Sequence, residues 1–273
     1  MSQKITELLQ KYNLRPRKGL GQNFLVDPHH LGRIIEAAEL TPEDVVLEIG
    51  PGPGTLTRLL VESARQVIAV ELDAAMVNLL RQELGHHSNL ALVQADILQV
   101  DLPALIGGTR RYKVVANLPY YITSAVLRHI LETVPRPACV VVTVQKEVAQ
   151  RIVASPGQMS LLAVSVQFYG RPTLVHRIPA GAFYPPPKVD SAVLRIDPYP
   201  TPRVEVADVE QFFRVVRAGF GKKRKQLRNA LSAGLGRPPA QVEQILQAAG
   251  IDPRRRAETL SLEEWARLAA AIV

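Results

Sequence analysis

The sequence predicts an α/β fold, a doubly wound parallel sheet, followed by a small helical domain. Three observations support this prediction. Short apolar runs of strand length alternate with amphipathic stretches of helical length up to residue 145, as in chains whose parallel strands are joined by helical crossovers. A glycine-rich loop separates the first such strand from the helix after it. Three prolines then fall within five residues in DPYPTPRV (197–204), and the later apolar stretches have helical periodicity.

The expected elements follow one another along the chain. An amphipathic helix over 28–39 comes first, and after it the pattern predicts strand 45–49, helix 55–64, strand 66–71, helix 74–84, strand 90–95, helix 103–106, strand 113–117, helix 123–133 and strand 138–145. The strands are short runs rich in β-branched residues, whereas the helices repeat apolar residues every three to four positions. Two further β-like segments, 172–178 and 190–196, predict an antiparallel pair that closes the sheet.

After the proline-rich segment the pattern is helical only. The segments are VEQFFRVVRAGF, LRNALSAGL, AQVEQILQAAG and SLEEWARLAAAIV, and each repeats apolar residues at the helical period. We therefore expect a domain boundary after residue 198, with an α/β domain over 1–198 and an all-α domain over 199–273.

Composition restricts the class of protein. Apolar residues make up 47% of the 273 residues and charged residues 21%, which is typical of a folded globular protein. The single cysteine, Cys139, excludes an intramolecular disulfide framework and a cysteine-based zinc site, and it is typical of a reducing cytosol. No apolar run approaches the roughly 18 residues that cross a bilayer, and the first residues lack the layout of a signal peptide. We therefore expect a cytoplasmic protein without a membrane partner.

The positive charge is concentrated in short clusters. The net charge is +8, and basic residues gather in RPRK (15–18), RR (110–111), KKRK (222–225) and RRR (254–256). Such clusters favour a nucleic acid partner, because lysine and arginine release the counterions that condense on phosphates. The alternative is a generally basic, solvated surface.

The loop EIGPGPGTLT (48–57) is a candidate nucleoside-binding loop. Gly50, Gly52 and Gly54 allow a tight turn and a close approach of a ligand to the backbone. Their G-x-G-x-G spacing differs from the dinucleotide fingerprint, and Glu48, two positions earlier, suits a cationic ligand better than a pyrophosphate. S-adenosylmethionine is such a ligand, since it carries a sulfonium and an ammonium but no phosphate. The glycines alone are also compatible with a purely structural turn.

Two acidic residues occur at the ends of the next two strands. Glu71 ends the strand QVIAVE, where a carboxylate can accept from both ribose hydroxyls of a nucleoside. Asp96 follows the strand LALVQA, where it can accept from an adenine amine. Either acid alone is compatible with a solvated strand end. Because the carboxyl ends of parallel strands meet at one edge of the sheet, the three features together predict a nucleoside-bearing cofactor.

The segment NLPYY (117–121) ends the fourth strand at the same edge. Two acceptors are available here, Asn117 and a backbone carbonyl near Leu118 or Pro119. They can accept from the two N–H groups of an exocyclic adenine amine, and these hydrogen bonds favour a pyramidal nitrogen. Tyr120 can stack on the base, as aromatic side chains do on unstacked bases. The alternative is a β-turn in which Pro119 fixes φ and the two tyrosines pack. We interpret the segment as the binding site for a flipped-out base that carries an amino group.

The order of the motifs resembles the KsgA/RsmA family of ribosomal RNA adenine N6,N6-dimethyltransferases. The matching segments extend along most of the chain: KGLGQNFLVD (18–27), LEIGPGPGTLT, VELD, ADIL, NLPYYIT, QKEVAQRI (145–152), FYPPPKVDSAVL (183–194) and FGKKRKQLRNAL (220–231). The resemblance implies a Rossmann-like methyltransferase sheet, S-adenosylmethionine as methyl donor with no metal, and a monomer. It also implies the substrate, two adjacent adenosines near the 3′ end of small-subunit (16S) ribosomal RNA, and a role in 30S subunit biogenesis.

The same resemblance implies individual roles. The cofactor contacts would be Asn23, Leu25, Gly50, Gly52, Glu71, Asp96 and Asn117. The target base would be held by Asn117, Leu118, Pro119 and Tyr120, with Phe183 stacking on its other face. Two positions depart from the family's common pattern. Tyr121 stands where asparagine is more frequent and can alter the width of the pocket, and Pro53 stands where leucine, threonine or serine is more frequent.

The stretch GKKRKQLRNAL (221–231) resembles the basic helix that opens the family's C-terminal domain. On a helix, Lys222, Lys225 and Asn229 fall along one face, with Arg228 adjacent. We expect RNA phosphates to be contacted by Lys222, Lys223, Arg224, Lys225 and Arg228. The alternative is a solvated helix surface.

Two other functions remain open at the level of the sequence. An Erm-type methyltransferase of large-subunit ribosomal RNA shares the catalytic domain, although KVDSA (188–192) and KKRKQLRN resemble KsgA rather than Erm. A binding protein that has kept the fold without the activity is the second, and the intact Glu71, Asp96 and NLPY argue against it.

Overall fold

The computed structural model describes residues 2–109 and 111–272. The chain forms two compact units. Unit 1 comprises residues 1–149 and 171–198, and unit 2 comprises residues 150–170 and 199–273. None of the helices within the described ranges is long and apolar enough to cross a membrane.

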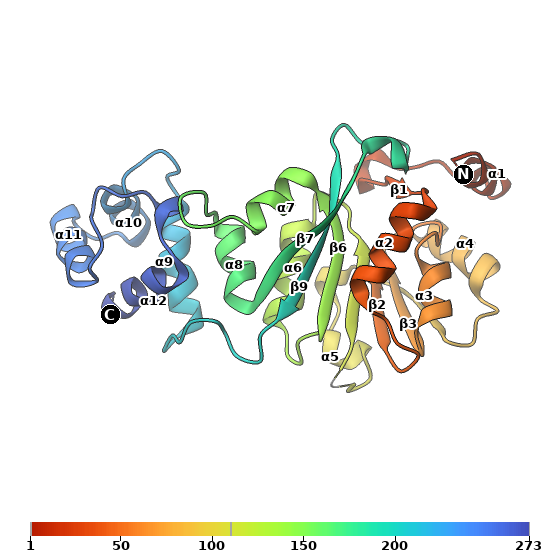
Figure 1. Cartoon of the computed structure of the whole chain (residues 1–273), viewed down its shortest axis with the longest axis horizontal. Coiled ribbons are helices and arrows are strands. Elements are labelled where there is room, and N and C mark those ends of the chain that lie inside the picture. The colour runs from red at the N-terminus through yellow and green to blue at the C-terminus, as the bar shows by residue number, and fades with distance from the viewer. Residues whose placement is uncertain (1, 110, 273) are drawn as a thin grey trace. The chain divides into compact units, whose positions relative to one another are not determined.

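Unit 1 is built on a seven-stranded sheet with the order β4-β3-β2-β5-β6-β9-β7 (Figure 1). The strands are β2 (Val45–Ile49), β3 (Gln66–Glu71), β4 (Leu90–Gln94), β5 (Lys113–Asn117), β6 (Cys139–Gln145), β7 (Gly170–Ile178) and β9 (Ser191–Pro198). The first five of these run parallel, and β9 pairs antiparallel with β6. The predicted α/β sheet with an antiparallel closing strand is therefore confirmed.

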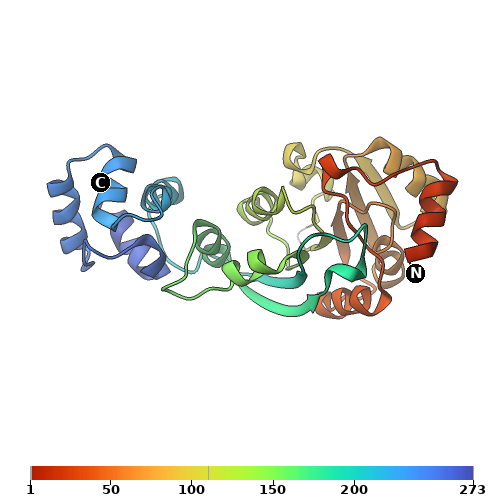
Figure 2. The same cartoon turned by 90° about the horizontal axis from the view of Figure 1, so that it is seen from above.

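Helices cover both faces of this sheet. They are α2 (Pro28–Ala38), α3 (Thr57–Ser63), α4 (Ala74–Leu84), α5 (Leu102–Leu105) and α6 (Thr123–Glu132), whereas α1 (Ser2–Lys11) packs against α4 and the segment around Phe24. Asp27 and Asp73 begin α2 and α4, because their carboxylates accept backbone N–H groups of the first turn. Figure 2 shows α2 and α6 on opposite sides of the sheet. With both faces covered, the central strands are continuous apolar runs rather than alternating ones.

A second, two-stranded sheet holds the N-terminal motif against a distant part of the chain. β1 (Phe24–Leu25) pairs antiparallel with β8 (Phe183–Tyr184). The loop before β1 is fixed by Asp73, whose carboxylate accepts from Gln22 Nε2 at 3.1 Å and pairs with Arg17 at 3.3 Å. These contacts hold the loop beside the edge at which the parallel strands end.

Unit 2 is helical and has an aromatic core. Its helices are α8 (Leu161–Tyr169), α9 (Val209–Phe220), α10 (Leu227–Leu235), α11 (Pro239–Ala248) and α12 (Leu262–Ala271), and α7 (Lys146–Ile152) leads into it from unit 1. Phe168 of α8 stacks on Phe212 of α9 with ring centroids 4.8 Å apart, and both rings are fully buried. This packing explains why residues 150–170 belong to the helical unit, whereas the sequence places them in the first domain.

The predicted basic helix over 221–231 is wrong in its first part. α9 ends at Phe220 and α10 begins at Leu227, so the KKRK segment (222–225) lies in the turn between them. Gly221 ends α9, and glycine is an unfavourable residue for continuing a helix by about 1 kcal/mol relative to alanine. Four adjacent cations add repulsion, which an exposed turn relieves better than a helix does.

Candidate functional site

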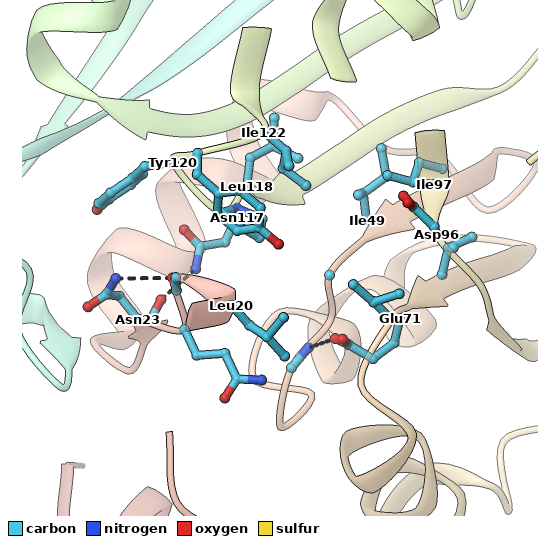
Figure 3. Close-up of a pocket in the computed structure, with 18 of the residues that line it drawn as sticks. Leu20, Asn23, Ile49, Glu71, Asp96, Ile97, Asn117, Leu118, Tyr120 and Ile122 are labelled. Atoms are coloured by element: carbon cyan, nitrogen blue, oxygen red, sulfur yellow. Dashed lines mark hydrogen bonds between the residues drawn. The ribbon is translucent and has the colours of Figure 1, made fainter. Parts of the chain in front are cut away.

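A cavity of about 380 Å³ opens where β2, β3 and β5 end, beside the loop that precedes β1 (Figure 3). This volume lies within the range of small-molecule sites. Among the residues predicted from the sequence, the cavity is lined by Asn23, Gly50, Gly52, Glu71, Asp96, Asn117, Leu118, Pro119 and Tyr120. Tyr121, which the sequence indicates as a residue that can alter the pocket width, also lines the cavity. The lining residues that the sequence did not indicate are Leu20, Gly21, Gln22, Phe24, Ile49, Val70, Leu72, Ala95, Ile97, Leu98 and Ile122.

The glycine loop approaches the cavity because its glycines have left-handed backbone angles. The φ angle is 65° at Gly50 and 55° at Gly52, values that residues with a Cβ adopt only at a cost. Space is limiting as well, since a Cβ on Gly52 would lie 2.8 Å from the ring of Phe24. A Cβ on Gly50 would meet Pro119 of the NLPYY segment at 3.6 Å. The loop backbone therefore forms one wall of the cavity.

Glu71 ends β3 and is oriented by two backbone N–H groups. Its Oε2 accepts from Gly52 N at 3.1 Å, as Figure 3 shows, and its Oε1 accepts from Asp73 N at 2.9 Å. Burial raises the pKa of the Glu71 carboxyl, and the bonds from Asp73 and Gly52 act against this increase. Each carboxylate oxygen keeps a second lone pair, so the oriented group can still accept from hydroxyls in the cavity.

Asp96 follows β4 and begins the short helix η2 (Ile97–Gln99). Its Oδ1 accepts from Leu98 N at 3.0 Å, which holds the side chain in place. Figure 3 shows Asp96 and Glu71 on one side of the cavity and Asn23 and Tyr120 on the other. The two carboxylates therefore lie at the same end of the cavity.

The polar groups of the lining fit a cationic nucleoside. They include two carboxylates, and none of the described residues that line the cavity is a lysine, an arginine or a histidine. Carboxylates attract a positive charge and accept from hydroxyls, whereas they repel a phosphate. The residues present therefore suit a ribose that carries a sulfonium group and do not suit a pyrophosphate.

Asn117 is oriented by the N-terminal motif. Its Nδ2 donates to the Asn23 carbonyl at 3.0 Å, and Asn23 Nδ2 donates in turn to the Gly21 carbonyl at 3.1 Å. The first bond occupies the donor side of the Asn117 amide, so Oδ1 is left as the acceptor. A preoriented acceptor thus ends β5 at the edge of the cavity.

The residues after Asn117 are held by their own contacts. The Pro119 carbonyl accepts from Ile122 N at 3.3 Å and from Thr123 Oγ1 at 3.4 Å. Leu118 is buried and donates its N–H to the Thr143 carbonyl at 3.2 Å. Because the Pro119 carbonyl is already engaged, the Leu118 carbonyl is the better candidate for the second acceptor.

Tyr120 lines both the first cavity and a second one of about 940 Å³. Its hydroxyl lies 2.6 Å from the Ser191 hydroxyl, which fixes the direction of the ring. The second cavity also contains Tyr184 and the basic residues Arg15, Lys18 and Lys188. Unlike the first cavity, it carries positive side chains, so it suits an approaching nucleic acid strand.

Two predicted site residues do not line either cavity. Leu25 is 1% exposed and Phe183 is 2% exposed, and they face each other across the β1–β8 pair within the apolar core. Phe183 is therefore not placed to stack on a base in this conformation. Successive residues of a strand face opposite sides, and Tyr184, the next residue, lines the second cavity instead.

Glu48 does not face a cationic ligand, contrary to the interpretation of its sequence position. The side chain is 1% exposed within β2. Burial, opposed by Thr57 and reinforced by Glu71, raises the pKa of the Glu48 carboxyl to about 8. Within the described part of the chain, its Oε2 has no hydrogen-bond partner. The group is therefore mostly protonated at neutral pH and contributes no charge to the cavity.

Replacing Glu48 with glutamine is expected to reduce the pH dependence of stability. The folded-state pKa of about 8 exceeds the ordinary value of 4.5, so between these values the folded chain binds more protons than the unfolded chain. Wild-type stability is therefore lost as the pH rises through this window, by a few kcal/mol at most, on the order of 1.4 per pKa unit.

Glutamine does not titrate, so the difference between urea unfolding at about pH 5 and about pH 8 should shrink in Glu48→Gln. The exposed Glu62 in α3 provides a matched control, because Glu62→Gln removes a carboxylate that water already solvates. Equal pH dependence in wild type and Glu48→Gln would contradict the assignment of a buried, protonated carboxyl.

The basic residues predicted to bind RNA separate into two groups. The KKRK segment (222–225) is exposed in the α9–α10 turn. Arg228, in contrast, is partly buried, and its Nη1 lies 2.8 Å from Glu243 Oε2. Arg214 and Arg217 of α9 line a hollow of about 340 Å³ together with the first lysine of the segment, and sequence reasoning missed them. Their spacing of three residues on a helix is the signal that identifies them.

Curated relatives of the chain share one name. A family model described as ribosomal RNA adenine dimethylase matches residues 13–272. The chain is 51% identical over 262 residues to the ribosomal RNA small subunit methyltransferase A of Dehalococcoides mccartyi, a match that covers 96% of this chain and 90% of that protein. It is 44% identical over 277 residues to the protein of the same name from Pelotomaculum thermopropionicum, with coverages of 97% and 94%.

Solved structures agree with this result. The crystal structure of the 23S rRNA methyltransferase ErmE matches with a TM-score of 0.70 and 33% identity, over 91% of this chain and 99% of that one. A dimethyladenosine transferase from Plasmodium falciparum matches with a TM-score of 0.73 over 90% of this chain and 95% of that one, and at 24% identity it supports the fold. The chain belongs to the ribosomal RNA adenine dimethylase family and is a methyltransferase of ribosomal RNA adenines.

Proposed function

We propose that this enzyme dimethylates the N6 amines of two adjacent adenosines near the 3′ end of small-subunit (16S) ribosomal RNA, and that it acts in 30S subunit biogenesis. The methyl donor is S-adenosylmethionine, whose sulfonium supplies an electrophilic methyl group. The observation that carries the proposal is the position of Asn117, an oriented acceptor at the edge of a cavity lined by two carboxylates and no described cation. The curated relatives named for the small subunit support the choice of substrate.

Asn117 and Leu118 hold the target amine in this proposal. An adenine amine is a poor nucleophile, because its lone pair is delocalised into the ring. When Asn117 Oδ1 and the Leu118 carbonyl accept its two N–H groups, the nitrogen is held pyramidal and the lone pair points away from both acceptors. The amine would then form its new N–C bond to the methyl group while the methyl–sulfur bond breaks, the sulfur would leave as a neutral thioether, and the resulting ammonium would release one proton to water. A strong general base is not required, since the N–H proton becomes acidic only as that bond forms.

The aromatic residues of the two cavities hold the base itself. Tyr120 lines both the cofactor cavity and the basic one, with its hydroxyl bonded to Ser191. A flipped-out adenine that enters from the basic cavity would stack on this ring. Tyr184 lines the entry cavity, where an aromatic ring can pack against a neighbouring unstacked base.

The cofactor is held by the strand ends. Glu71 accepts from the ribose hydroxyls and Asp96 from the adenine amine, while Gly50 and Gly52 let the ligand lie against the backbone. Asn23 acts through its carbonyl, which orients Asn117. Leu25 supports the site from the core rather than touching the ligand.

Methyl transfer from labelled cofactor to unmethylated small subunits tests the proposal. The expected product is N6,N6-dimethyladenosine at two adjacent positions near the 3′ end of the RNA. Large-subunit RNA is included because the match to ErmE keeps an Erm-type specificity as the second candidate. Label in large-subunit RNA only would reject the proposed substrate, and no label in either RNA would favour a binding protein without activity.

The KKRK segment (222–225) is proposed to contact RNA phosphates, together with Arg214 and Arg217 beside it. Replacing Lys222, Lys223 and Lys225 with glutamine should weaken subunit binding, and the slope of log affinity against log salt should shrink by about 0.7 to 0.9 per lost phosphate contact. Arg228 is expected to contribute less, because its ion pair with Glu243 must open first.

A matched triple variant distinguishes the loss of local RNA contacts from the effect of a lower net charge. Glutamine at Arg65, Arg81 and Arg128 also removes three positive charges, from exposed positions of unit 1. This control should keep the wild-type salt slope, and neither variant should change cofactor affinity. If both triple variants lose the same affinity and slope, the segment is only part of a generally basic surface.

We also propose that the enzyme is a cytoplasmic monomer. The reduced, buried Cys139 and the ribosomal substrate support the compartment, and the family resemblance supports the oligomeric state. Light scattering at micromolar concentration should give a mass near 30.0 kDa, and a concentration-dependent doubling would reject the monomer.

A further inference from the structure

Three histidines converge on the surface of unit 1, outside the cofactor cavity. His29 and His30 lie in the first turn of α2, and His176 lies on β7, 146 residues after His30. One ring nitrogen from each histidine lies within 4.8 Å of the corresponding nitrogen of the other two. The closest approach is 2.8 Å, between His30 Nδ1 and His176 Nε2. None of the three lines the cavity that holds the proposed reaction.

The cluster has the donor set of a transition-metal site. Neutral imidazole is a preferred ligand of Zn²⁺, and three histidines with an open fourth position form a known type of zinc site. Zn–N bonds of about 2.0–2.1 Å in a tetrahedron place ligand nitrogens roughly 3.4 Å apart. The three nitrogens lie within 4.8 Å of one another, so the exposed or half-exposed rings have to rotate toward this spacing to complete the site.

The contact between His30 and His176 is compatible with metal binding. In the hydrogen-bonded pair, one of the two facing nitrogens carries the proton. If each ring instead carries its proton on its other nitrogen, both facing nitrogens present lone pairs, and the net charge of the pair is unchanged.

The positive charges next to the cluster are partly compensated by carboxylates. Arg33, one turn along α2, would repel a cation, but it is paired with Glu36. The N-terminus of α2 carries a partial positive charge, which the Asp27 carboxylate offsets by accepting from His29 N and His30 N. The three imidazoles therefore decide whether a cation binds.

We propose that His29, His30 and His176 bind one divalent transition-metal ion of the zinc class, with water in the open position. The ion joins the N-terminus of α2 to β7, two segments that are distant in the sequence. α2 follows β1, whose pairing with β8 holds the N-terminal motif at the cofactor cavity. The role of this metal is to stabilise unit 1, and it takes no part in methyl transfer.

The test uses the full chain without a histidine tag, after treatment with a chelator. Zn²⁺ is titrated against a competing chromophoric chelator, and Co²⁺ is added separately because tetrahedral Co²⁺ absorbs in the visible range. We expect one ion per chain and an unfolding temperature that rises with zinc concentration. His30→Ala and His176→Ala should each weaken binding at least about 100-fold, more than the loss of an outer-shell partner does.

His86 and His87 provide a matched control. They are also adjacent in sequence, with ring centroids 4.2 Å apart, but among the described residues no third histidine, cysteine or carboxylate completes a group with them. The His86→Ala/His87→Ala variant should bind zinc as wild type does.

Folding of each variant is checked by circular dichroism, and His29→Gln at an exposed position gives a second, milder test. If wild type binds no stoichiometric ion, or if the variants of His30 and His176 bind it as wild type does, the cluster is only a hydrogen-bonded imidazole pair. Methyl transfer in the presence of chelator is expected to stay at the wild-type rate, so this result is independent of the proposed function.

Discussion

Asn117→Ala is expected to lower the single-turnover rate of methyl transfer about 10²- to 10³-fold, the usual effect of removing one preoriented hydrogen-bond partner of a reacting group. The reason is the geometry at the end of β5. Asn117 Nδ2 is committed to the Asn23 carbonyl at 3.0 Å, so the amide presents Oδ1 to the target amine. Alanine removes this acceptor and leaves the Leu118 carbonyl as the single remaining one.

Cofactor affinity separates this effect from damage to the cavity. Asn117 is only partly buried, so we expect the unfolding midpoint of the variant to stay close to that of wild type and the S-adenosylmethionine affinity to change by less than the rate. Asn78→Ala, at an exposed position of α4, is the matched loss of an asparagine amide and should leave the rate unchanged. Near-normal single-turnover methylation by Asn117→Ala would reject the proposed role of the amide.

The sequence predicts the cofactor edge of the sheet well, because each of its features follows directly from the chain. Strands of continuous apolar residues are recognisable, and a residue that ends such a strand must lie at the edge. Glu71, Asp96 and Asn117 are placed by this argument alone, and all three line the cavity. Left-handed glycines such as Gly50 and Gly52 are likewise expected from a tight loop.

The orientations of the residues on the other side of the site depend on tertiary contacts, which local sequence patterns do not show. The orientation of Asn117 rests on Asn23, 94 residues earlier. Which of Phe183 and Tyr184 faces the substrate depends on the register of β8 against β1, and a shift of one residue exchanges the two faces. The sequence motif contains both aromatics, so it does not decide between them.

The assignment of residues 150–170 and the basic segment differ from the sequence prediction for two different physical reasons. Residues 150–170 join unit 2 because the ring of Phe168 packs on Phe212, a tertiary contact between segments far apart in the chain. The KKRK segment was expected on a helix from the family resemblance, but Gly221 ends α9 just before it. Glu48 illustrates a third limit, because its raised pKa comes from complete burial, which no sequence position reveals.

Glu71→Ala is expected to weaken S-adenosylmethionine binding, with a much smaller effect on the rate at saturating cofactor. The carboxylate ends β3, is 8% exposed, and has both oxygens fixed by backbone N–H groups of Gly52 and Asp73. A ligand hydroxyl that meets an oriented charged acceptor gains about 1.5 to 3 kcal/mol, which corresponds to a loss of roughly 10- to 150-fold in affinity on substitution.

Glu71→Gln tests whether cofactor affinity depends on the charge of this side chain or on its size and shape. Glutamine keeps the size of the side chain, but its amide can accept only through one oxygen, so Gly52 N, Asp73 N and the ligand hydroxyls compete for it. We expect its affinity to lie between those of wild type and Glu71→Ala, while Glu62→Gln at an exposed site binds as wild type does. Calorimetry that finds unchanged S-adenosylmethionine affinity in Glu71→Ala would remove Glu71 from the cofactor site. The cavity would then have to bind the ribose through Asp96 or the loop backbone alone.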